Sequence, residues 1–275
     1  MIYEDIKKNI KIQAETIEIG RNVHFGKNIS VSLKGKFSIG DFSQIGNDAH
    51  IRGNNITIGK HLFNSSGLRI GGGGRQHPNA DFTIGDRCTI HNNFINVCEP
   101  VAIGDDVGLS PDTSLLTHGY WLSVLEGYPA SFAGIKIGNG VIVGYRSLIM
   151  MGVEIADFSV IGAQSVVTKS ITRKGIYAGS PAKFIKEIIP LTPDQKKQKL
   201  KEIIECYIPI ANYHGITANI SVNFPIVHMN NFVFNSETFE YWGKEDQETD
   251  DFRDYIRKWG IRIYTERGFI SKFSF

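Results

Sequence analysis

The sequence has few cysteines, no long apolar segment and almost no net charge. Its three cysteines, Cys88, Cys98 and Cys206, are too scattered for a disulfide scaffold, and none belongs to a C-x-x-C pair. No stretch approaches the roughly 18 apolar residues that cross a membrane, so we expect no membrane span. Lys and Arg number 30 against 28 Asp and Glu, and the resulting charge of +2 gives no reason to expect nucleic-acid binding.

The N-terminal residues MIYEDIKKNI lack the apolar stretch of a signal peptide. We therefore expect a soluble, cytoplasmic protein. Of its 275 residues, 41% are hydrophobic, which is enough to bury a large core without disulfides or structural metals.

Glycine is distributed unevenly along the chain. Residues 1–189 contain 25 of the 29 glycines, and residues 190–275 contain the other 4. This change in composition indicates two regions of different construction. We expect a domain of residues 1–190 and a smaller domain of residues 191–275.

Aliphatic residues recur at every sixth position in the first region. The clearest series runs without a slip through Ile137, Val143, Ile149, Ile155, Ile161 and Val167. A glycine often follows the aliphatic residue, as in Ile39-Gly40, Ile84-Gly85 and Ile137-Gly138. A helix would place apolar residues three and four apart, and a plain strand would alternate them, so neither explains the pattern. Short strands stacked as a solenoid of about 18 residues per coil explain it, with glycine accommodating the corners.

The repeat is most regular in IKIGNGVIVGYRSLIMMGVEIADFSVIGAQSVVTKSI (135–171), which is followed by YAGSPAKFIKEI (177–188). With these motifs the chain resembles the hexapeptide-repeat acyltransferases over roughly residues 15–189, and its ending is similar to that of the galactoside, maltose and polysaccharide O-acetyltransferases. The resemblance implies a left-handed parallel β-helix, so we expect a mainly β protein with a small C-terminal α+β extension. The alternative, a β-sandwich, would have irregular turns about 8–12 residues apart.

Two segments, residues 71–81 and 116–134, interrupt the repeat. The first, GGGGRQHPNAD, is too polar and flexible for a coil and is expected to form an exposed loop. The second carries Tyr120 and Trp121, and we expect it to stack on a sugar or to contact another subunit. A loop without function is the alternative.

Beyond Pro190 the pattern changes, and no motif of the resembling enzymes covers the region. Thr192-Pro193-Asp194-Gln195 is a capping box with proline at the first helical position. We expect, in chain order, a helix at 193–208, strands within 216–242, a helix at 250–259 that ends at Gly260, and a hairpin formed by 261–264 and 269–275.

His118 is the candidate catalytic residue. It follows GDDVGLSPDTSL (104–115), after which the resembling O-acetyltransferases carry their catalytic histidine, although Gly119 replaces the proline that commonly follows theirs. A neutral imidazole can take the proton of an acceptor hydroxyl as the oxygen attacks a thioester, and the imidazolium can then protonate the leaving thiolate. A structural histidine is the alternative.

The resemblance also assigns residues that contact the acceptor. His91, Asn92 and Asn93 lie where relatives place an asparagine that orients the acceptor, and the alignment leaves open which of the three takes that role. They could instead be ordinary polar residues on the surface of a coil. His77, in the glycine-rich loop, is better explained as a solvated loop histidine.

By the same resemblance, donor binding belongs to the last coils. Six positions match those that contact coenzyme A in the galactoside-type enzymes, namely Tyr145, Ala163, Thr168, Lys169, Lys183 and Lys186. Relatives have serine at the first of these positions and arginine at the last two. Lysine still supplies positive charge for the phosphates, but without the planar fork of arginine. An ordinary basic surface is the alternative.

These features predict an acetyl-coenzyme A-dependent O-acetyltransferase that transfers the acetyl group directly, with His118 as general base. The expected acceptor is a sugar hydroxyl in a capsular or O-antigen polysaccharide or its precursor, because the sequence lacks the N-terminal helical segment of the galactoside and maltose enzymes. The alternatives are an N-acetyltransferase of an amino-sugar nucleotide and a non-catalytic solenoid that serves assembly.

The resemblance further implies a homotrimer with each active site between two subunits. We expect no metal, because the residues around Val107–Leu109 and the following coil offer no histidines at the spacing of zinc ligands.

Overall fold

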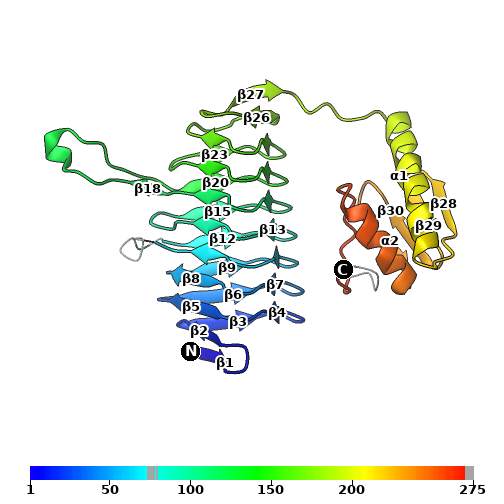
Figure 1. Cartoon of the computed structure of the whole chain (residues 1–275), viewed down its shortest axis with the longest axis horizontal. Helices are drawn as coiled ribbons and strands as arrows, with labels where there is room; N and C mark the ends of the chain where they lie inside the picture. The colour runs from blue at the N-terminus through cyan, green and yellow to red at the C-terminus, as the bar shows by residue number, and fades with distance from the viewer. Residues whose placement is uncertain (73–77, 79, 270–275) are drawn as a thin grey trace. The chain divides into compact units, whose positions relative to one another are not determined.

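The computed structural model describes residues 1–72, 78 and 80–269, and these fold as two compact units (Figure 1). Unit 1 is Met1–Ile188 and unit 2 is Ile189–Phe275. Each unit has a hydrophobic core of its own, and the two cores share no residue. Most of the loop expected at 71–81, including His77, lies outside the described residues.

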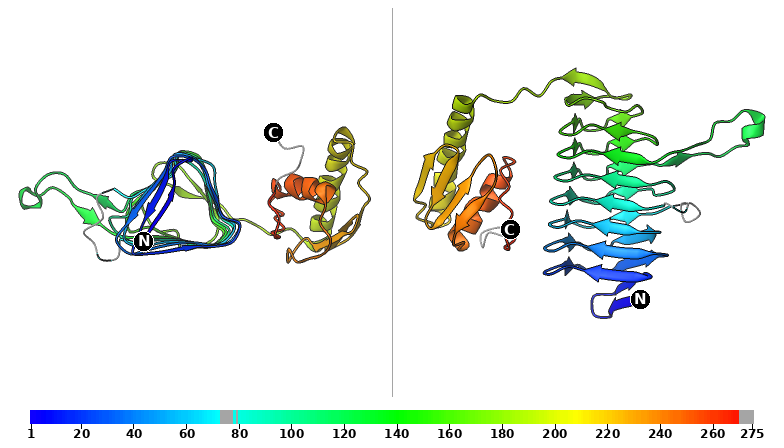
Figure 2. Two further views of the ribbon diagram at one scale, coloured as in Figure 1. Left: turned by 90° about the horizontal axis from the view of Figure 1, so that it is seen from below. Right: turned by 180° about the vertical axis from the view of Figure 1, so that it is seen from behind.

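Unit 1 is a parallel β-solenoid with three faces, which the view along its coils shows as a triangle (Figure 2). Face A consists of β1 (Ile2–Asp5), β2 (Ile10–Gln13), β5 (Ile29–Leu33), β8 (His50–Gly53), β11 (Arg69–Ile70), β14 (Phe94–Ile95), β17 (Ser114–Leu115), β22 (Leu148–Ile149) and β25 (Val166–Val167). Face B consists of β3 (Thr16–Ile19), β6 (Lys36–Ile39), β9 (Ile56–Ile58), β12 (Phe82–Ile84), β15 (Val101–Ile103), β20 (Ile135–Ile137) and β23 (Glu154–Ile155). Face C consists of β4 (His24–Phe25), β7 (Gln44–Ile45), β10 (Phe63–Asn64), β13 (Thr89–Ile90), β16 (Gly108–Leu109), β21 (Ile142–Val143), β24 (Val160–Ile161), β26 (Ile176–Ala178) and β27 (Lys183–Lys186).

Neighbouring strands of each face pair in parallel, except for the antiparallel pairs β1–β2 and β26–β27 at the two ends. The chain passes from face A to face B to face C and back to face A, so the solenoid has an A–B corner, a B–C corner and a C–A corner. The mainly β, parallel solenoid that the six-residue repeat predicts is therefore confirmed.

The six-residue repeat corresponds to aliphatic side chains that stack inside the solenoid. On face B the ladder runs through Ile19, Ile39, Ile58, Ile84, Ile103, Ile137 and Ile155. All but the first of these are buried. Each coil thus covers the apolar surface of its neighbour, which contributes about 25 cal/mol for each Å² removed from water.

The glycine after the aliphatic residue is required by the close approach of successive coils. A Cβ on Gly46 would lie 1.8 Å from the carbonyl oxygen of Ser65, and a Cβ on Gly40 would lie 2.7 Å from the backbone of the next coil. Neither glycine has a positive φ. The left-handed residue of the corner stands two positions later, at Phe42 (φ 59°) and Asp48 (φ 60°). Space between coils, rather than backbone conformation, therefore selects glycine here.

The residue after that glycine bonds to the neighbouring coil. At the B–C corner, Asp86 Oδ1 accepts a hydrogen bond from the backbone N–H of Lys60 at 2.7 Å, and Asp105 Oδ1 accepts one from the backbone N–H of Asp86 at 2.9 Å. Asn139 continues the series, and Asp157 does the same after an alanine, Ala156. The Ile-Gly-Asp/Asn triplets thus pair corner N–H groups that the strands leave without a partner.

Unit 2 packs two helices and a four-stranded antiparallel sheet around one core. Its elements are α1 (Pro193–Tyr213), β28 (Ile220–Asn223), β29 (Ile226–Met229), β30 (Phe232–Asn235), β31 (Tyr241–Gly243) and α2 (Gln247–Arg257). Helix α1 begins at the predicted capping box but continues beyond residue 208, through Pro209, because Ala211 extends its buried stripe. Helix α2 begins earlier than residue 250, because the Asp246 carboxylate caps it by accepting from the Thr249 N–H at 2.8 Å.

The strand predicted at 261–264 is wrong, since the described residues 261–269 contain no strand. The Ile263 carbonyl instead accepts hydrogen bonds from Nε and Nη2 of Arg253, at 3.2 and 2.8 Å. The remaining N–H groups of this fully buried guanidinium donate to Glu245, Asp250 and the backbone of Arg267. A buried Arg must find acceptors for its five N–H groups, so it binds backbone that the predicted hairpin would have used. The remainder of that hairpin, residues 270–275, lies outside the described residues.

Candidate active site

The segment 116–134 projects from the coils of the solenoid at the A–B corner, and the chain rejoins face B at Ile135 (Figure 1). At its base β18 (His118–Gly119) pairs with β19 (Ser131–Phe132) in antiparallel fashion, and a short 3-10 helix, η1 (Val124–Glu126), forms its tip. The two short strands hold His118 half-buried where the segment meets the solenoid.

A buried amide holds the imidazole of His118. Asn96 lies at the same A–B corner, just after β14, and its side chain is 2% exposed. The distance from His118 Nδ1 to Asn96 Oδ1 is 2.8 Å. An amide oxygen only accepts hydrogen bonds, so Nδ1 must carry the ring proton and donate a hydrogen bond to Asn96. The other ring nitrogen, Nε2, is then unprotonated in the neutral ring and can accept a proton.

The hydrogen bonds of Asn96 determine which of its atoms faces the histidine. Its Nδ2 donates to the backbone carbonyls of Gly71 and Gly72. Its Oδ1 also accepts from the Cys98 N–H at 3.2 Å and from the hydroxyl of Thr117, which is fully buried. Turning the amide over would place donors against donors, so the tautomer of His118 follows from the backbone around it.

Two aromatic rings flank His118. Its ring is stacked with that of Phe132, with centroids 6.0 Å apart and an interplanar angle of 13°. The Tyr120 ring lies 5.4 Å from each of them. Further along the segment, Trp121 and Leu125 are 90% and 91% exposed. The segment therefore presents ring faces and apolar side chains to whatever binds there.

His91, Asn92 and Asn93 lie at a different corner, the C–A corner. His91 Nδ1 is 2.9 Å from Ser65 Oγ, and burial lowers the pKa of this imidazole. Asn93 is fully buried, with its oxygen accepting from the His91 N–H at 2.7 Å and its amide donating to the backbone of the next coil. Asn92 is exposed and accepts from the Asp112 N–H at 3.1 Å. Asn93 thus stabilises the corner through its hydrogen bonds, whereas His91 and Asn92 remain accessible to a substrate.

The six residues proposed for the donor are all exposed and lie on the last coils. By position they are Tyr145 and Ala163 at the C–A corner, Thr168 and Lys169 at the A–B corner, and Lys183 and Lys186 on β27. The guanidinium of Arg146 lies 4.9 Å from the centre of the Tyr145 ring and is 3.4 Å from Asp112. Where relatives have serine, this chain therefore has a tyrosine held against a cation.

Apart from Lys183 and Lys186 on β27, the candidates thus divide between two corners of one prism. His118, Thr168 and Lys169 share the A–B corner, and the strands that precede them pair in register from Leu115 through Ile149 to Val167. His91, Asn92, Tyr145 and Ala163 share the C–A corner. One copy of the chain does not bring the two groups together.

Sequence reasoning missed the residues that position His118. Asn96, Thr117 and Phe132 lie in no motif, and only the structure brings them to the histidine. No sequence signal marked Asn96, because the equivalent positions of other coils, such as Arg52 and Thr168, are exposed. Arg146 was also missed.

Within the described ranges, no three His, Cys, Asp or Glu side chains gather so that they could hold a metal ion. No helix among the described residues is long and apolar enough to cross a membrane.

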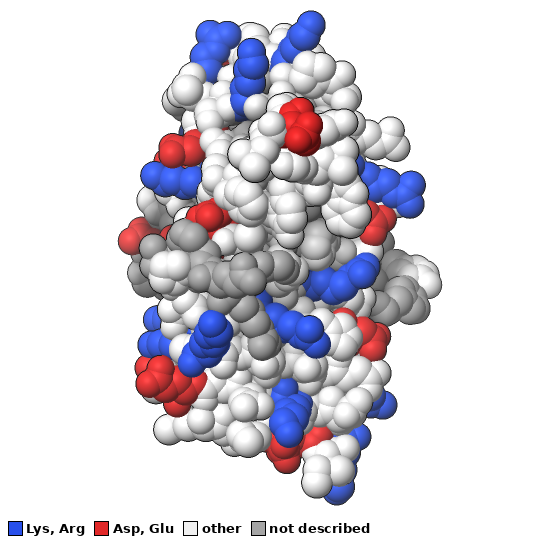
Figure 3. Space-filling view, turned by 90° about the vertical axis from the view of Figure 1, so that its left-hand side faces the viewer, with Lys and Arg blue, Asp and Glu red and all other residues white. Residues whose placement is uncertain are grey.

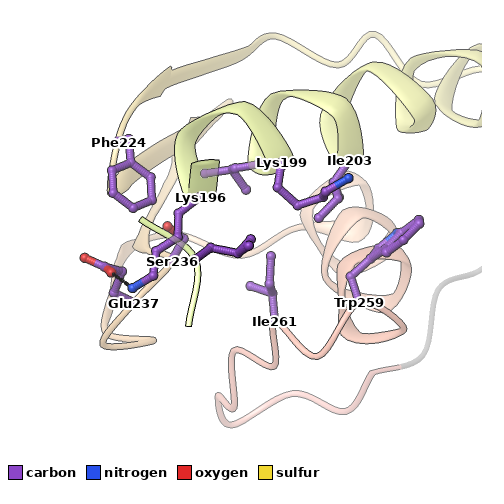
Figure 4. Close-up of a pocket in the computed structure, with 10 residues that line it drawn as sticks. Lys196, Lys199, Ile203, Phe224, Ser236, Glu237, Trp259 and Ile261 are labelled. Atoms are coloured by element: carbon purple, nitrogen blue, oxygen red, sulfur yellow. Dashed lines mark hydrogen bonds and ion pairs between the residues drawn. The ribbon is translucent and has the colours of Figure 1, made fainter. Parts of the chain in front are cut away.

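Unit 2 has an open pocket of about 410 Å³ beside α1 (Figure 4). Apolar side chains such as Leu200, Ile203 and Ile261 line it. Its lysines are paired, because Lys196 Nζ lies 2.5 Å from Glu237 Oε1 and Lys199 pairs with Glu202. None of the residues predicted for catalysis or donor binding lines this pocket.

Comparison with known proteins shows homology to acetyltransferases. The chain is 35% identical to the galactoside O-acetyltransferase of Escherichia coli (strain K12) over 135 residues, which are 48% of this chain and 64% of that enzyme. It is 49% identical to a chloramphenicol acetyltransferase of Morganella morganii over 51 residues, 18% of this chain and 24% of that one. The matches thus span less than two thirds of either relative. No family model matches.

Among solved structures, the chain is similar to a galactoside acetyltransferase in complex with coenzyme A. The two are 25% identical, with a TM-score of 0.34, over 63% of this chain and 65% of that one.

Proposed function

We propose that this chain, a β-solenoid protein homologous to acetyltransferases, is an acetyl-coenzyme A-dependent O-acetyltransferase that acts on a sugar hydroxyl. The observation that supports this most directly is the hydrogen bond of 2.8 Å from His118 Nδ1 to Asn96 Oδ1. It leaves Nε2 free to act as a base at the foot of an exposed aromatic segment.

The reaction we propose begins when the acceptor hydroxyl donates a hydrogen bond to His118 Nε2. The hydroxyl oxygen attacks the thioester carbonyl carbon while its proton moves to Nε2. The tetrahedral intermediate then expels the thiolate of coenzyme A, and the imidazolium gives the proton to this thiolate. The products are an acetyl ester and free coenzyme A. Because Nδ1–H donates to Asn96 in both the neutral and the charged ring, the imidazole keeps its orientation throughout.

The donor would bind to the last coils. Lys169, Lys183 and Lys186 are exposed there and supply positive charge for the phosphates of coenzyme A. Arg146 adds a fourth cation beside Tyr145.

We also propose that the protein is a cytoplasmic homotrimer in which two subunits complete each site. Two observations support a second copy as partner: the candidate residues occupy two corners of one prism, and the segment 116–134 exposes large apolar side chains such as Trp121 and Leu125. Light scattering should give three times the monomer mass of 30.7 kDa, and a monomer would contradict the assembly.

For the acceptor we propose a capsular or O-antigen polysaccharide or its precursor, with the rings beside His118 as the surface on which a sugar packs. The purified chain should release free thiol from acetyl-coenzyme A in the presence of such a glycan. The variant His118→Ala should lower this rate by about 10²–10⁴-fold without changing the melting temperature. The control His24→Ala, at an exposed position of face C, should keep full activity.

Each other outcome counts against a named part of the proposal. Unchanged turnover in His118→Ala would remove this histidine from the mechanism. A base-stable amide product in mass spectrometry, in place of a base-labile ester, would favour the N-acetyltransferase. Failure to bind coenzyme A in calorimetry would favour the non-catalytic solenoid.

Asn96 acts through His118 and is a positioning residue. Asn96→Ala should lower kcat roughly tenfold or more, because the tautomer and orientation of the ring are no longer set. Asn96→Asp keeps an acceptor for Nδ1–H, so it should retain turnover while the negative charge raises the apparent pKa of the base in the pH–rate profile. If Asn96 has only a structural role, Asn96→Asp should leave the apparent pKa in the pH–rate profile unchanged.

A further inference from the structure

The three faces of the solenoid carry charge in different ways. On face B, whose strands include two lysines and two glutamates, each lysine stands opposite a glutamate: Lys36 Nζ is 2.6 Å from Glu18, and Lys136 is paired in register with Glu154 of the next strand. Face C has no Asp, Glu, Lys or Arg from β4 to β26. The strands of face A from β5 to β25 contain Arg and His but no acidic residue.

The basic residues of face A lie next to one another. Arg69 pairs directly with His50 in the neighbouring strand, and Arg52 is two positions further along the strand of His50. Side chains two positions apart in a strand point to the same face, and neighbouring strands lie about 4.8 Å apart. All three residues are exposed. We call His50, Arg52 and Arg69 the cationic strip.

The strip has no counterion among the described residues. Neither Arg52 nor Arg69 makes an ion pair or a side-chain hydrogen bond with any of them, although arginine is always charged. The surface view of the side from which the segment 116–134 projects shows several blue side chains in its lower half, together with red ones (Figure 3).

The cationic strip lies on the same face as the strand that precedes His118. On face A the ladder continues from Arg69 to Phe94, which is half-buried, and then to Ser114, four residues before the histidine. At the A–B corner, Gly71 packs on Arg52, and the carbonyl of Gly71 accepts from the amide of Asn96. A chain that lies along face A with its charges on the strip would therefore reach the proposed base.

We propose that the cationic strip binds the carboxylates or phosphates of the acceptor, so that the substrate of this enzyme is an acidic glycan that lies along face A. This inference rests on the proposed function. Two guanidinium groups and an imidazole recognise carboxylate or phosphate oxygens through charge-assisted hydrogen bonds. The aromatic ring of Phe94, next on the ladder, offers a surface for a sugar ring.

The test is binding of a labelled oligogalacturonate to the full chain, with a neutral oligogalactan of equal length for comparison. The double variant Arg52→Gln/Arg69→Gln should weaken oligogalacturonate binding tenfold or more, and raise KM for acidic acceptors with little change in kcat. The wild-type affinity should fall steeply with added salt. The control Lys36→Gln/Lys136→Gln removes the same charge from face B and should change the affinity less than twofold.

Other results would overturn the proposal. Equal affinity for the acidic and the neutral glycan would do so, and so would equal weakening in the face B control. A third arm uses UDP-N-acetylglucosamine, and dependence on the strip in this arm alone would assign the strip to a nucleotide-linked acceptor instead. A strip-dependent oligogalacturonate complex without acetyl transfer to any acceptor would reject the enzymatic function but keep the strip.

Discussion

The two units of this chain differ in whether they bury charged side chains. Unit 1 encloses aliphatic ladders and keeps its charged side chains at corners and on faces. Unit 2 buries a whole guanidinium, Arg253, together with Asp250 and Asp251. A solenoid gains its stability from many equal contacts between neighbouring coils, whereas the smaller unit depends on one network that organises α2 and the segment after it.

The largest difference between the units should appear when the buried cation is removed. Arg253→Met leaves Glu245 without its ion-pair partner and Asp250 with Arg267 alone, and it should cost about 3–5 kcal/mol of the free energy of unfolding. Hydrogen exchange should show this loss in the amides of unit 2, because the cores of the two units share no residue. Arg257→Met, which breaks the more exposed pair with Asp254, should cost about 1 kcal/mol or less. Equal losses in the two variants would refute the role given to Arg253.

In the solenoid the corresponding weak point is a glycine. Gly46→Ala places a methyl group 1.8 Å from a carbonyl oxygen of the next coil, and the shift that relieves this contact should cost about 1–3 kcal/mol in urea unfolding. Gly108 has no atom within 4 Å of an added Cβ, so Gly108→Ala should be close to neutral. If the two substitutions cost the same, close approach of the coils does not explain the repeated glycine.

Among the residues that the structure describes, α-helix ends contribute stability in unit 2 alone, since unit 1 has only the short η1. The Thr192 side chain accepts from the Gln195 N–H at 3.3 Å in a complete capping box. Thr192→Ala should therefore lower the stability of unit 2 by about 1 kcal/mol. Ser221→Ala, at an exposed strand position of the same unit, should change the stability of unit 2 by no more than about 0.5 kcal/mol. An equal loss of stability in both variants would contradict the role given to the capping box.

The last expected effect is absent at neutral pH and appears only in alkaline solution. Burial inside the solenoid raises the pKa of Cys88 from 9.0 to about 12. Between these values the unfolded chain releases the thiol proton and the folded chain keeps it, so the unfolding free energy falls as pH rises. In unit 2, burial and the charge of Asp251 likewise raise the pKa of Tyr207.

The contribution of Cys88 can be isolated by comparing the wild type with Cys88→Ala between pH 9 and 12. The wild type should lose more stability over this range than the variant. Equal slopes would show that the thiol ionises in the folded solenoid as readily as in the unfolded chain.

Recurring signals made the solenoid predictable, whereas unit 2 was predicted only in part. An aliphatic residue at every sixth position, observed over many coils, leaves few alternatives for the fold. The capping box at Thr192 correctly located the start of α1. The strand at 261–264 could not be excluded from local pattern, because its competitor is a guanidinium of α2 that reaches Ile263 only in the folded chain.

The sequence by itself determined the repeat and the stacked aliphatic core, since both depend on residue types at fixed spacings along the chain. The choice of His118 came instead from the resemblance to the hexapeptide-repeat acyltransferases. Only the tertiary structure decided that Asn96 sets the tautomer of that histidine and that most of the other candidates lie at two separate corners. The same holds for the cationic strip, whose members come from different coils. Hydrogen bonds and charge act over a few ångströms in space, and in a solenoid residues about 20 positions apart become direct neighbours.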